Sequence, residues 1–263
     1  MSEIEGYART SFASDGKARE VYTTGSGPAV IVISEIPGIT PKVAEFGRRV
    51  AAIGCTAWLP RLFGEPGRPP SGAYVMRSFV PACISAEFAA FATNRSRPVT
   101  VWLRALARHA HDVCGGPGVG AVGMCFTGGF ALAMMVDDVV VAPVLSQPSL
   151  PLPIGARRRR DVGISDSDLA RVKRRCADEP DLCVLGLRFT GDRAVPPERF
   201  QRLRDELGDK FIAVELDSSA GNPHGHPRAA HSVLTEHLQD RDGTPTHDAL
   251  EQVLELFRKQ LLR

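Results

Sequence analysis

Residues 118–136 read GVGAVGMCFTGGFALAMMV, and this stretch decides the fold more than any other part of the chain. Its first part, Gly118 to Met124, is apolar and predicts a buried strand, and Gly128 to Val136 predicts the helix that leaves it. Cys125 stands at the apex of the tight turn between them. A side chain held there lies in strained backbone geometry, so its neighbours must be small, and Gly123 meets that need. The segment therefore predicts a strand–turn–helix unit that presents a sulfur atom.

Strands alternate with helices along most of the rest of the chain. Apolar runs predict further strands over 29–33, 55–59, 139–142, 183–189 and 211–216. Apolar residues at helical spacing predict helices over 41–53, 99–111, 169–176, 197–207 and 249–262. Only the opening, from about Ala8 to Tyr22, predicts antiparallel strands, with a turn at Asp15-Gly16. The pattern predicts one α/β domain over residues 1–263, with a mostly parallel central sheet and helices on both faces.

Composition narrows the classes of function. The chain has 263 residues, 43% hydrophobic and 24% charged, which is typical of a soluble globular protein. A formal net charge of +2 gives no reason to expect nucleic acid as a partner. The basic run Arg157 to Arg160 lacks interleaved aromatic residues and predicts a solvated loop, with an anion or partner contact as the alternative. No stretch approaches the ~20 continuous apolar residues of a membrane helix, so no membrane is expected either.

The N-terminus and the cysteines bear on the compartment. Met1 to Glu5 carries acids and no apolar segment, so no secretory signal is expected and the cytoplasm is the predicted location. The six cysteines form no CxxC pair, which argues against a zinc site or a thioredoxin-type motif, and a reducing compartment argues against a disulfide framework. Most of them should be small buried hydrophobic residues. The sequence gives no indication of the oligomeric state.

Cys125 differs from the others because its position favours a thiolate. It would stand at a helix N-terminus, where backbone N–H groups stabilise negative charge and lower a thiol pKa from its usual value of about 8.5. The N–H of Phe126 can point into the same space as half of an oxyanion hole. Two residues after Cys125, Thr127 replaces the usual glycine. The alternative is a buried cysteine in a glycine-rich turn that binds phosphate or only packs.

Partners for Cys125 follow later strands, in the chain order nucleophile, acid, histidine that is typical of α/β-hydrolases. Asp192 follows the strand over 183–189 and can accept a hydrogen bond from a histidine, although an aspartate there could also be a plain turn residue. The loop after Leu216 holds three histidines. His231 fits the end of that loop best as the general base, and His224 is the second choice. The His-Gly-His spacing lacks a carboxylate or cysteine beside it, so no metal is expected.

These residues together resemble the dienelactone hydrolase family. The likeness extends to Ile31–Ile39, where a glutamate precedes a short apolar turn, and to Ala57–Phe63; it covers roughly residues 25–65 and 115–260. The resemblance implies an α/β-hydrolase fold with a triad of Cys125, Asp192 and His231. It also implies that Glu35 contacts the resting thiol, and that the N–H groups of Ile36 and Phe126 form the oxyanion hole.

The resemblance implies hydrolysis of a small-molecule ester or lactone through a thioester intermediate, without a cofactor. Arg77 and Arg193 are candidates for binding a substrate carboxylate, although either can be a surface charge. A buried carboxylate is costly if unpaired, so Glu35 should hydrogen-bond Cys125 or carry a raised pKa, unless it faces solvent. Two other classes stay open: a redox or thiol-sensing protein that uses Cys125 without hydrolysis, and a non-catalytic scaffold that binds a partner.

Overall fold

An eight-stranded sheet runs through the computed structural model, which describes residues 4–263. Residues 1–3 lie outside the described residues, and with them part of the N-terminus that was expected to carry no secretory signal and the first residues of the predicted domain. The strands are β1 (Ala8–Ser14), β2 (Lys17–Gly25), β3 (Ala29–Ile33), β4 (Thr56–Pro60), β5 (Val119–Met124), β6 (Val140–Ser146), β7 (Val184–Phe189) and β8 (Phe211–Leu216). They lie in the order β1-β2-β4-β3-β5-β6-β7-β8. The β1–β2 and β2–β4 pairs are antiparallel, and the remaining pairs are parallel. The predicted, mostly parallel sheet is confirmed.

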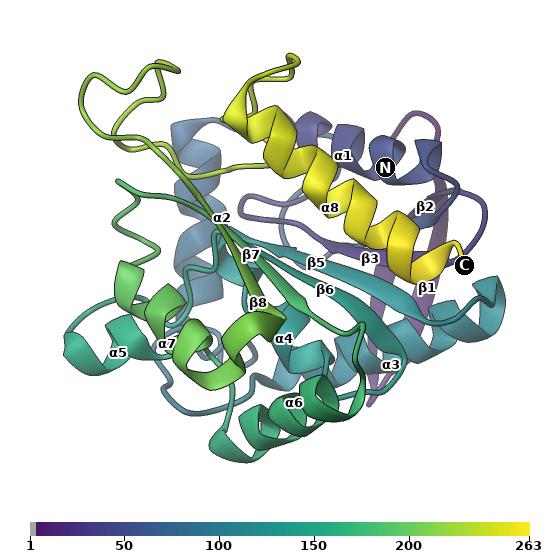
Figure 1. Ribbon diagram of the computed structural model, residues 1–263. Helices are drawn as coiled ribbons and strands as arrows, with labels where there is room; N and C mark the ends of the chain where they lie inside the picture. The colour runs from purple at the N-terminus through teal and green to yellow at the C-terminus, as the bar shows by residue number, and fades with distance from the viewer. Residues whose placement is uncertain (1–3) are drawn as a thin grey trace.

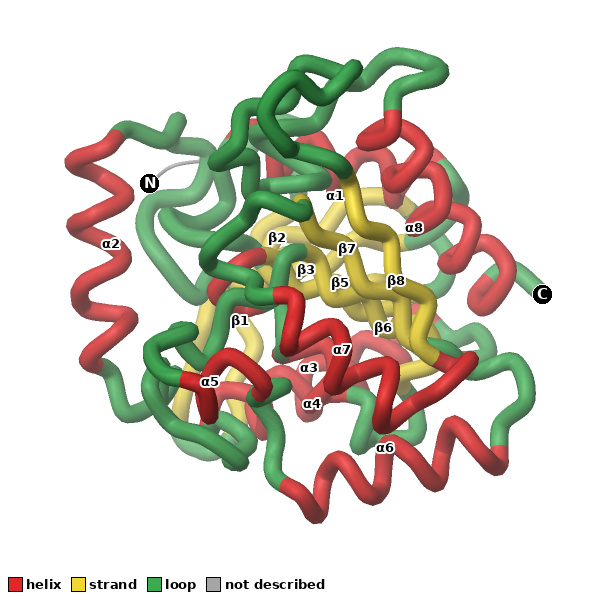
Figure 2. The backbone as a smooth tube through the Cα atoms, turned by 60° about the vertical axis from the view of Figure 1, so that its left-hand side comes forward, coloured by secondary structure: helices red, strands yellow, loops and turns green. Residues whose placement is uncertain are grey.

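Helices cover both faces of this sheet. They are α1 (Pro41–Ala52), α2 (Gly72–Ile84), α3 (Pro98–Cys114), α4 (Phe130–Met134), α5 (Ala156–Arg160), α6 (Asp166–Asp178), α7 (Pro197–Leu207) and α8 (Pro245–Leu261). In Figure 1, α1 and α8 lie over one face and α3, α4, α6 and α7 over the other, and each layer encloses its own cluster of buried apolar residues. Figure 2 shows α2 at the rim of the molecule, apart from both layers. Among residues 4–263, no helix has both the length and the apolar character needed to cross a bilayer.

Local signals explain where several elements begin and why they are buried. The hydroxyl of Thr40 accepts the Val43 N–H at 3.3 Å and caps α1, with Pro41 as its first residue. All five residues of β3 are buried because the strand lies inside the sheet, with a helical layer on each face. A helix over 197–207 and a strand over 211–216 match their predicted bounds.

Two sequence expectations about element boundaries are wrong. The strand predicted over 139–142 is too short, because β6 continues through Pro143 to Ser146. Pro143 pairs with Ala121 of β5, and the ladder with β7 begins only at Val144, so the missing N–H can face an unpaired stretch of the strand. The segment 128–136 was expected to be one helix, but a short 3₁₀ turn over 125–127 precedes α4, which is only five residues long.

The parallel strands end at one edge of the sheet, and polar residues follow several of these ends. Glu35 comes just after β3, Cys125 after β5 and Asp192 after β7. The long segment between β8 and α8, which contains His231, rises from the same edge in Figure 1. Crevices at the carboxyl ends of parallel strands are where α/β folds bind their ligands.

Candidate active site

The turn at Cys125 has the strained geometry that the sequence predicts. Cys125 has a φ of 54°, in the left-handed region that non-glycine residues rarely adopt. A Cβ added to Gly123 would lie 2.2 Å from the backbone oxygen of Thr127, so only glycine fits there. The packing that closes this turn therefore holds the sulfur at the end of β5.

Thr127 has a structural role at the position where glycine is usual. Its buried hydroxyl accepts the Met124 N–H at 3.0 Å and lies 2.9 Å from the Ile33 carbonyl oxygen and 3.2 Å from that of Ser34, to which it can donate. This one hydroxyl joins the turn to the end of β3, immediately before Glu35. The departure from glycine thus links two strand ends that carry candidate site residues.

Replacing Thr127 with valine is expected to lower the free energy of unfolding by about 1–3 kcal/mol, because the buried Met124 N–H loses its acceptor while side-chain volume stays nearly constant. Urea denaturation measures the change. Thr127→Ser keeps the hydroxyl and should lose clearly less. A larger loss in Thr127→Ser than in Thr127→Val would assign the effect to the methyl group, which only the valine variant keeps, and would contradict the hydrogen-bond account.

The structure brings Asp192 and His231 into direct contact. His231 Nδ1 lies 2.6 Å from Asp192 Oδ2, and Asp192 is buried. The other carboxylate oxygen of Asp192 accepts the Ala194 N–H at 2.9 Å, so the residue also holds its own turn. Asp192 therefore contacts both a histidine and its own turn. His224, the second choice for the base, is exposed, and its backbone oxygen accepts the side-chain amide of Gln239 at 2.9 Å.

A further histidine, His237, supports the backbone beside His231. Its Nδ1 accepts the N–H of His231 at 3.3 Å and that of Ser232 at 3.2 Å. Burial, followed by repulsion from His231, lowers the pKa of His237, which favours the neutral ring that this accepting role requires. Sequence reasoning missed His237 because it lies beyond the loop segment in which the base was sought.

Cys125, His231 and Glu35 converge. The sulfur, a ring nitrogen of His231 and a carboxylate oxygen of Glu35 all lie within 4.8 Å of one another. Burial alone would lower the pKa of His231, but attraction to Cys125 and hydrogen bonds with Asp192 and Cys125 together raise it well above its ordinary value. Among residues 4–263 these three also form the one donor set close enough to share a metal ion. The expectation of a metal-free site stays a prediction.

Glu35 is paired, but with the loop that carries His231. Its buried carboxylate accepts the Ser232 hydroxyl at 2.6 Å, the Thr235 hydroxyl, and the Gln147 side-chain amide at 3.5 Å. Glu35 therefore does not face solvent. The side-chain oxygen of Gln147 also accepts the Val233 N–H at 3.3 Å, so Glu35 and Gln147 hold the same loop from two strand ends.

The proposed oxyanion-hole residues lie at adjacent strand ends. Ile36 follows Glu35 after β3 and Phe126 follows Cys125 after β5, and these two strands pair directly. The Phe126 ring is buried in edge-to-face contact with three aromatic rings, with centroids 5.7–6.2 Å apart. These rings belong to Phe63, Phe79 and Phe88. They fix the residue that directly follows the sulfur.

A cavity of about 790 Å³ opens beside the Asp192–His231 pair. Arg193 and Arg228 are exposed at its lining, and neither pairs with a carboxylate in the part of the chain that the structure describes. Arg77, the other candidate for binding a substrate carboxylate, lines a separate cavity of about 500 Å³ under α2. The structure thus places Arg193 beside His231 and does not bring Arg77 to the same cavity.

The basic run Arg157 to Arg160 lies in the short helix α5 and not in a loop. Two of its side chains also have partners within the protein. Arg158 donates to the Phe91 carbonyl oxygen at 3.0 Å. Arg159 makes two hydrogen bonds to Glu198, at 2.8 and 2.9 Å, across to α7. These contacts fasten the short helix to its neighbours.

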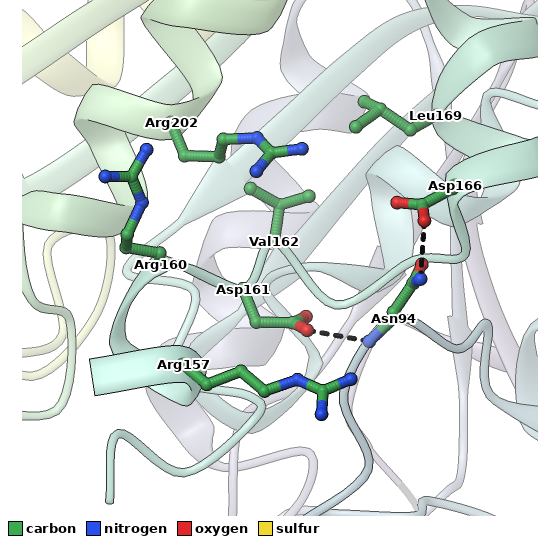
Figure 3. Close-up of a pocket in the computed structure, with 8 residues that line it drawn as sticks. All are labelled: Asn94, Arg157, Arg160, Asp161, Val162, Asp166, Leu169 and Arg202. Carbon is green, nitrogen blue, oxygen red and sulfur yellow. Dashed lines mark hydrogen bonds between the residues drawn. The ribbon is translucent and has the colours of Figure 1, made fainter. Parts of the chain in front are cut away.

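A smaller cavity of about 290 Å³ lies beside this helix (Figure 3). Its cationic lining residues are Arg157, Arg160 and Arg202. Carboxylates share the lining: Asp161 accepts the Asn94 backbone N–H at 2.7 Å and Asp166 accepts the Asn94 side-chain amide at 2.6 Å. Because charges of both signs are built into its wall, this cavity gives no clear preference for an anionic ligand.

His226 predicts a pH dependence of stability. The side chain is buried against Phe189, with ring centroids 5.0 Å apart, and its Nε2 has no hydrogen-bond partner among residues 4–263. Burial, followed by repulsion from His224, lowers the pKa of His226. The unfolded chain therefore binds this proton more readily, and stability should fall as pH drops below about 6.5 and onward through the lowered pKa. Urea denaturation between about pH 7 and pH 5 measures the fall, and His226→Phe should flatten that part of the curve. An unchanged slope would contradict this account.

The chain matches one family pattern in sequence and resembles several solved structures in fold. The sequence pattern described as the dienelactone hydrolase family matches residues 17–261. No curated protein matches the chain by sequence.

Among solved structures, a Klebsiella pneumoniae protein assigned to the dienelactone hydrolases is similar, with 20% identity, a TM-score of 0.65, and 96% of this chain and 98% of that chain covered. A dienelactone hydrolase-like promiscuous phosphotriesterase from metagenomic libraries shares 18% identity, with a TM-score of 0.61 and coverage of 97% and 98%. Dienelactone hydrolase from Anabaena variabilis shares 14%, with a TM-score of 0.61 and the same coverage. At these identities the structural likeness establishes the fold alone.

Proposed function

The chain belongs to the dienelactone hydrolase family, and on that premise we propose that it hydrolyses a small-molecule ester or lactone with Cys125 as nucleophile. One observation carries the proposal: the sulfur of Cys125 lies within 4.8 Å of a His231 ring nitrogen, and Nδ1 of the same ring lies 2.6 Å from Oδ2 of buried Asp192. A nucleophile, a base and a group that orients the base are the parts that covalent acyl transfer needs.

The proposed reaction has two halves. His231 takes the thiol proton of Cys125, and the thiolate attacks the carbonyl carbon to form a tetrahedral oxyanion, which the N–H groups of Ile36 and Phe126 bind. The carbon–oxygen bond of the ester then breaks, and His231 returns the proton to the departing alkoxide, which leaves a thioester. His231 next deprotonates a water molecule that attacks the thioester, and the acid and the free thiol are released. Asp192 fixes the ring orientation throughout.

The position of Glu35 supports a role in holding the base. Through Ser232 and Thr235 its carboxylate anchors the loop that carries His231, so it acts on the reaction through that loop. The cytoplasmic location also belongs to the proposal, because the six cysteines are all free thiols, as a reducing compartment would keep them.

Acyl trapping tests the proposed nucleophile. An activated aryl ester with slow deacylation should give a burst of phenol, and peptide mapping by mass spectrometry should find the acyl group on Cys125. Cys125→Ala should lose both the burst and steady turnover. Unchanged turnover in Cys125→Ala, or an acyl group on another residue, would overturn the proposal. Rapid peroxide oxidation of Cys125 without any acyl product would favour the thiol-sensing alternative.

The cavity beside His231 bears on the substrate. Arg193 and Arg228 give it two cations without carboxylate partners among the described residues, so it suits a substrate that bears a carboxylate. Saturation kinetics on carboxylate-bearing and neutral lactones tests this choice. Arg193→Gln should raise KM for the first set and leave the second unchanged. Equal kinetics on both sets would favour a broader esterase.

A further inference from the structure

Ser149 is tied to Cys125 at two points. Its hydroxyl oxygen lies 3.6 Å from the Cys125 sulfur, within reach of a hydrogen bond to sulfur, and its backbone N–H donates to the Cys125 carbonyl oxygen at 3.0 Å. Ser149 is only 4% exposed, so water has little access to its hydroxyl. The residue belongs to the segment after β6, the strand next to β5, and not to any of the elements that carry the proposed triad.

A buried arginine holds this segment in place. The guanidinium of Arg199, from α7, donates to the Pro148 carbonyl oxygen and to the Pro151 carbonyl oxygen, both at 2.6 Å. These two carbonyls lie on either side of Ser149. Arg199 is 1% exposed and makes two further bonds, to the carbonyl oxygens of Asp161 at 2.7 Å and Arg158 at 3.0 Å. The backbone on either side of Ser149 is therefore held in place by a buried cation.

The charges around the sulfur give this hydroxyl a task. A thiolate at Cys125 would lie within 4.8 Å of the Glu35 carboxylate, and like charges this close disfavour each other. The imidazolium of His231 offsets that repulsion on one side. A hydroxyl that donates to the sulfur stabilises its anionic form further, and in a buried site such a bond is stronger than in water.

We propose that Ser149 is a catalytic residue that donates its hydroxyl hydrogen bond to the Cys125 thiolate and keeps it ready for attack. This inference rests on the proposed function for its meaning in the reaction, but the contact itself can be measured without a substrate. Ser149 and His231 approach the sulfur from different segments of the chain, so each can be substituted without changing the other. The Ser149 hydroxyl loses its anionic partner when the thiolate becomes a thioester. It therefore stabilises the thiolate before the attack, and again in the second half of the reaction, when the thiolate leaves.

Thiolate absorbance in the ultraviolet, followed against pH, tests the proposal. Subtracting the signal of the Cys125→Ala protein isolates the one thiolate from the other five cysteines. Ser149→Ala should move the pH midpoint of this signal upward by about one unit, which corresponds to about tenfold less thiolate below the midpoint. Alkylation by iodoacetamide at the same pH should slow in proportion. Ser149→Thr keeps a hydroxyl and should restore most of both effects.

A matched control separates this role from packing. The Ser34 hydroxyl is also buried, just before Glu35 in the chain, but it has no hydrogen-bond partner within residues 4–263, the Cys125 sulfur included. Ser34→Ala should leave the midpoint unchanged. If Ser149→Ala changes thermal stability but not the midpoint, Ser149 is structural and the proposal is overturned. If the midpoint shifts while Cys125→Ala retains full esterase activity, the Ser149 contact stands and the proposed function fails.

Discussion

Replacing His231 with glutamine is expected to lower kcat/KM for ester hydrolysis by about 10²–10⁴-fold, whereas His224→Gln should stay within about twofold of the unchanged protein. His231 alone among the loop histidines contacts Asp192, at 2.6 Å, and has its ring within 4.8 Å of the Cys125 sulfur. His224 is exposed; its backbone oxygen accepts the Gln239 side-chain amide, and its ring centroid lies 6.2 Å from that of His226. Steady-state kinetics on one activated ester, with both variants shown to be folded by circular dichroism, compares the two directly. A comparable loss in both variants would contradict the assignment of the base.

The contact between His231 and Asp192 predicts how the stability of the protein depends on pH. Burial lowers the pKa of His231, but Cys125 and Asp192 outweigh it and the net direction is upward. A raised pKa means that the protonated ring contributes stability that is fully present below the unfolded value of about 6.5 and is lost as pH rises through the folded value. Asp192→Asn removes one of the groups responsible. The stability difference between the unchanged protein and Asp192→Asn, measured in urea, should therefore be larger at about pH 6 than at about pH 9.

Much of the site can be predicted from the sequence because its residues directly follow strands. Once the alternation of strands and helices is recognised, Glu35, Cys125 and Asp192 fall at the carboxyl ends of parallel strands, which meet at one edge of a sheet. The choice of His231 over His224 needed only the position of the loop end. The order of strands along the chain thus indicates which side chains can meet at the candidate site.

The supporting residues could not be predicted in the same way. Ser232 and Thr235 bind a carboxylate that lies 197 and 200 residues earlier in the chain. Serine and threonine are common in loops for local reasons, so their presence there carries no signal of a distant partner. Gln147 and Ser149 follow β6 closely, but the strand predicted over 139–142 stops short of Ser146, where β6 ends, and so misplaces its carboxyl end. An error about one strand boundary therefore hid two residues of the site.

The residues around Cys125 also show how the fold and the chemistry depend on each other. Thr127 ties the turn to β3, Gln147 and Glu35 hold the histidine loop, and Ser149 is bonded to the Cys125 backbone. Each contact joins segments that are distant in sequence. Precise placement of reacting groups requires support of this kind, because small displacements have large effects on rate.

Arg199→Met is expected to lower the free energy of unfolding by about 3–5 kcal/mol, because four carbonyl groups inside the protein lose their donor at about 1 kcal/mol or more each. Burial, with a further contribution from the neighbouring Arg97, lowers the pKa of Arg199 to about 9, so the guanidinium remains charged at neutral pH. For a chain of this size the melting temperature should drop by about 10 °C. Differential scanning calorimetry measures the drop.

Arg159→Met is the matched control, since Arg159 contacts the same part of the molecule but bonds Glu198 at the surface, with side-chain exposures of 39% and 42%. A surface ion pair contributes at most about 1 kcal/mol, so this variant should melt within about 4 °C of the unchanged protein. Arg199→Met should also lose ester hydrolysis at temperatures where it is still folded, because the carbonyls on either side of Ser149 are then no longer held. If Arg199→Met is destabilised yet hydrolyses esters at the full rate, the segment that carries Ser149 keeps its position without the arginine, and the link between this buried cation and the sulfur does not exist.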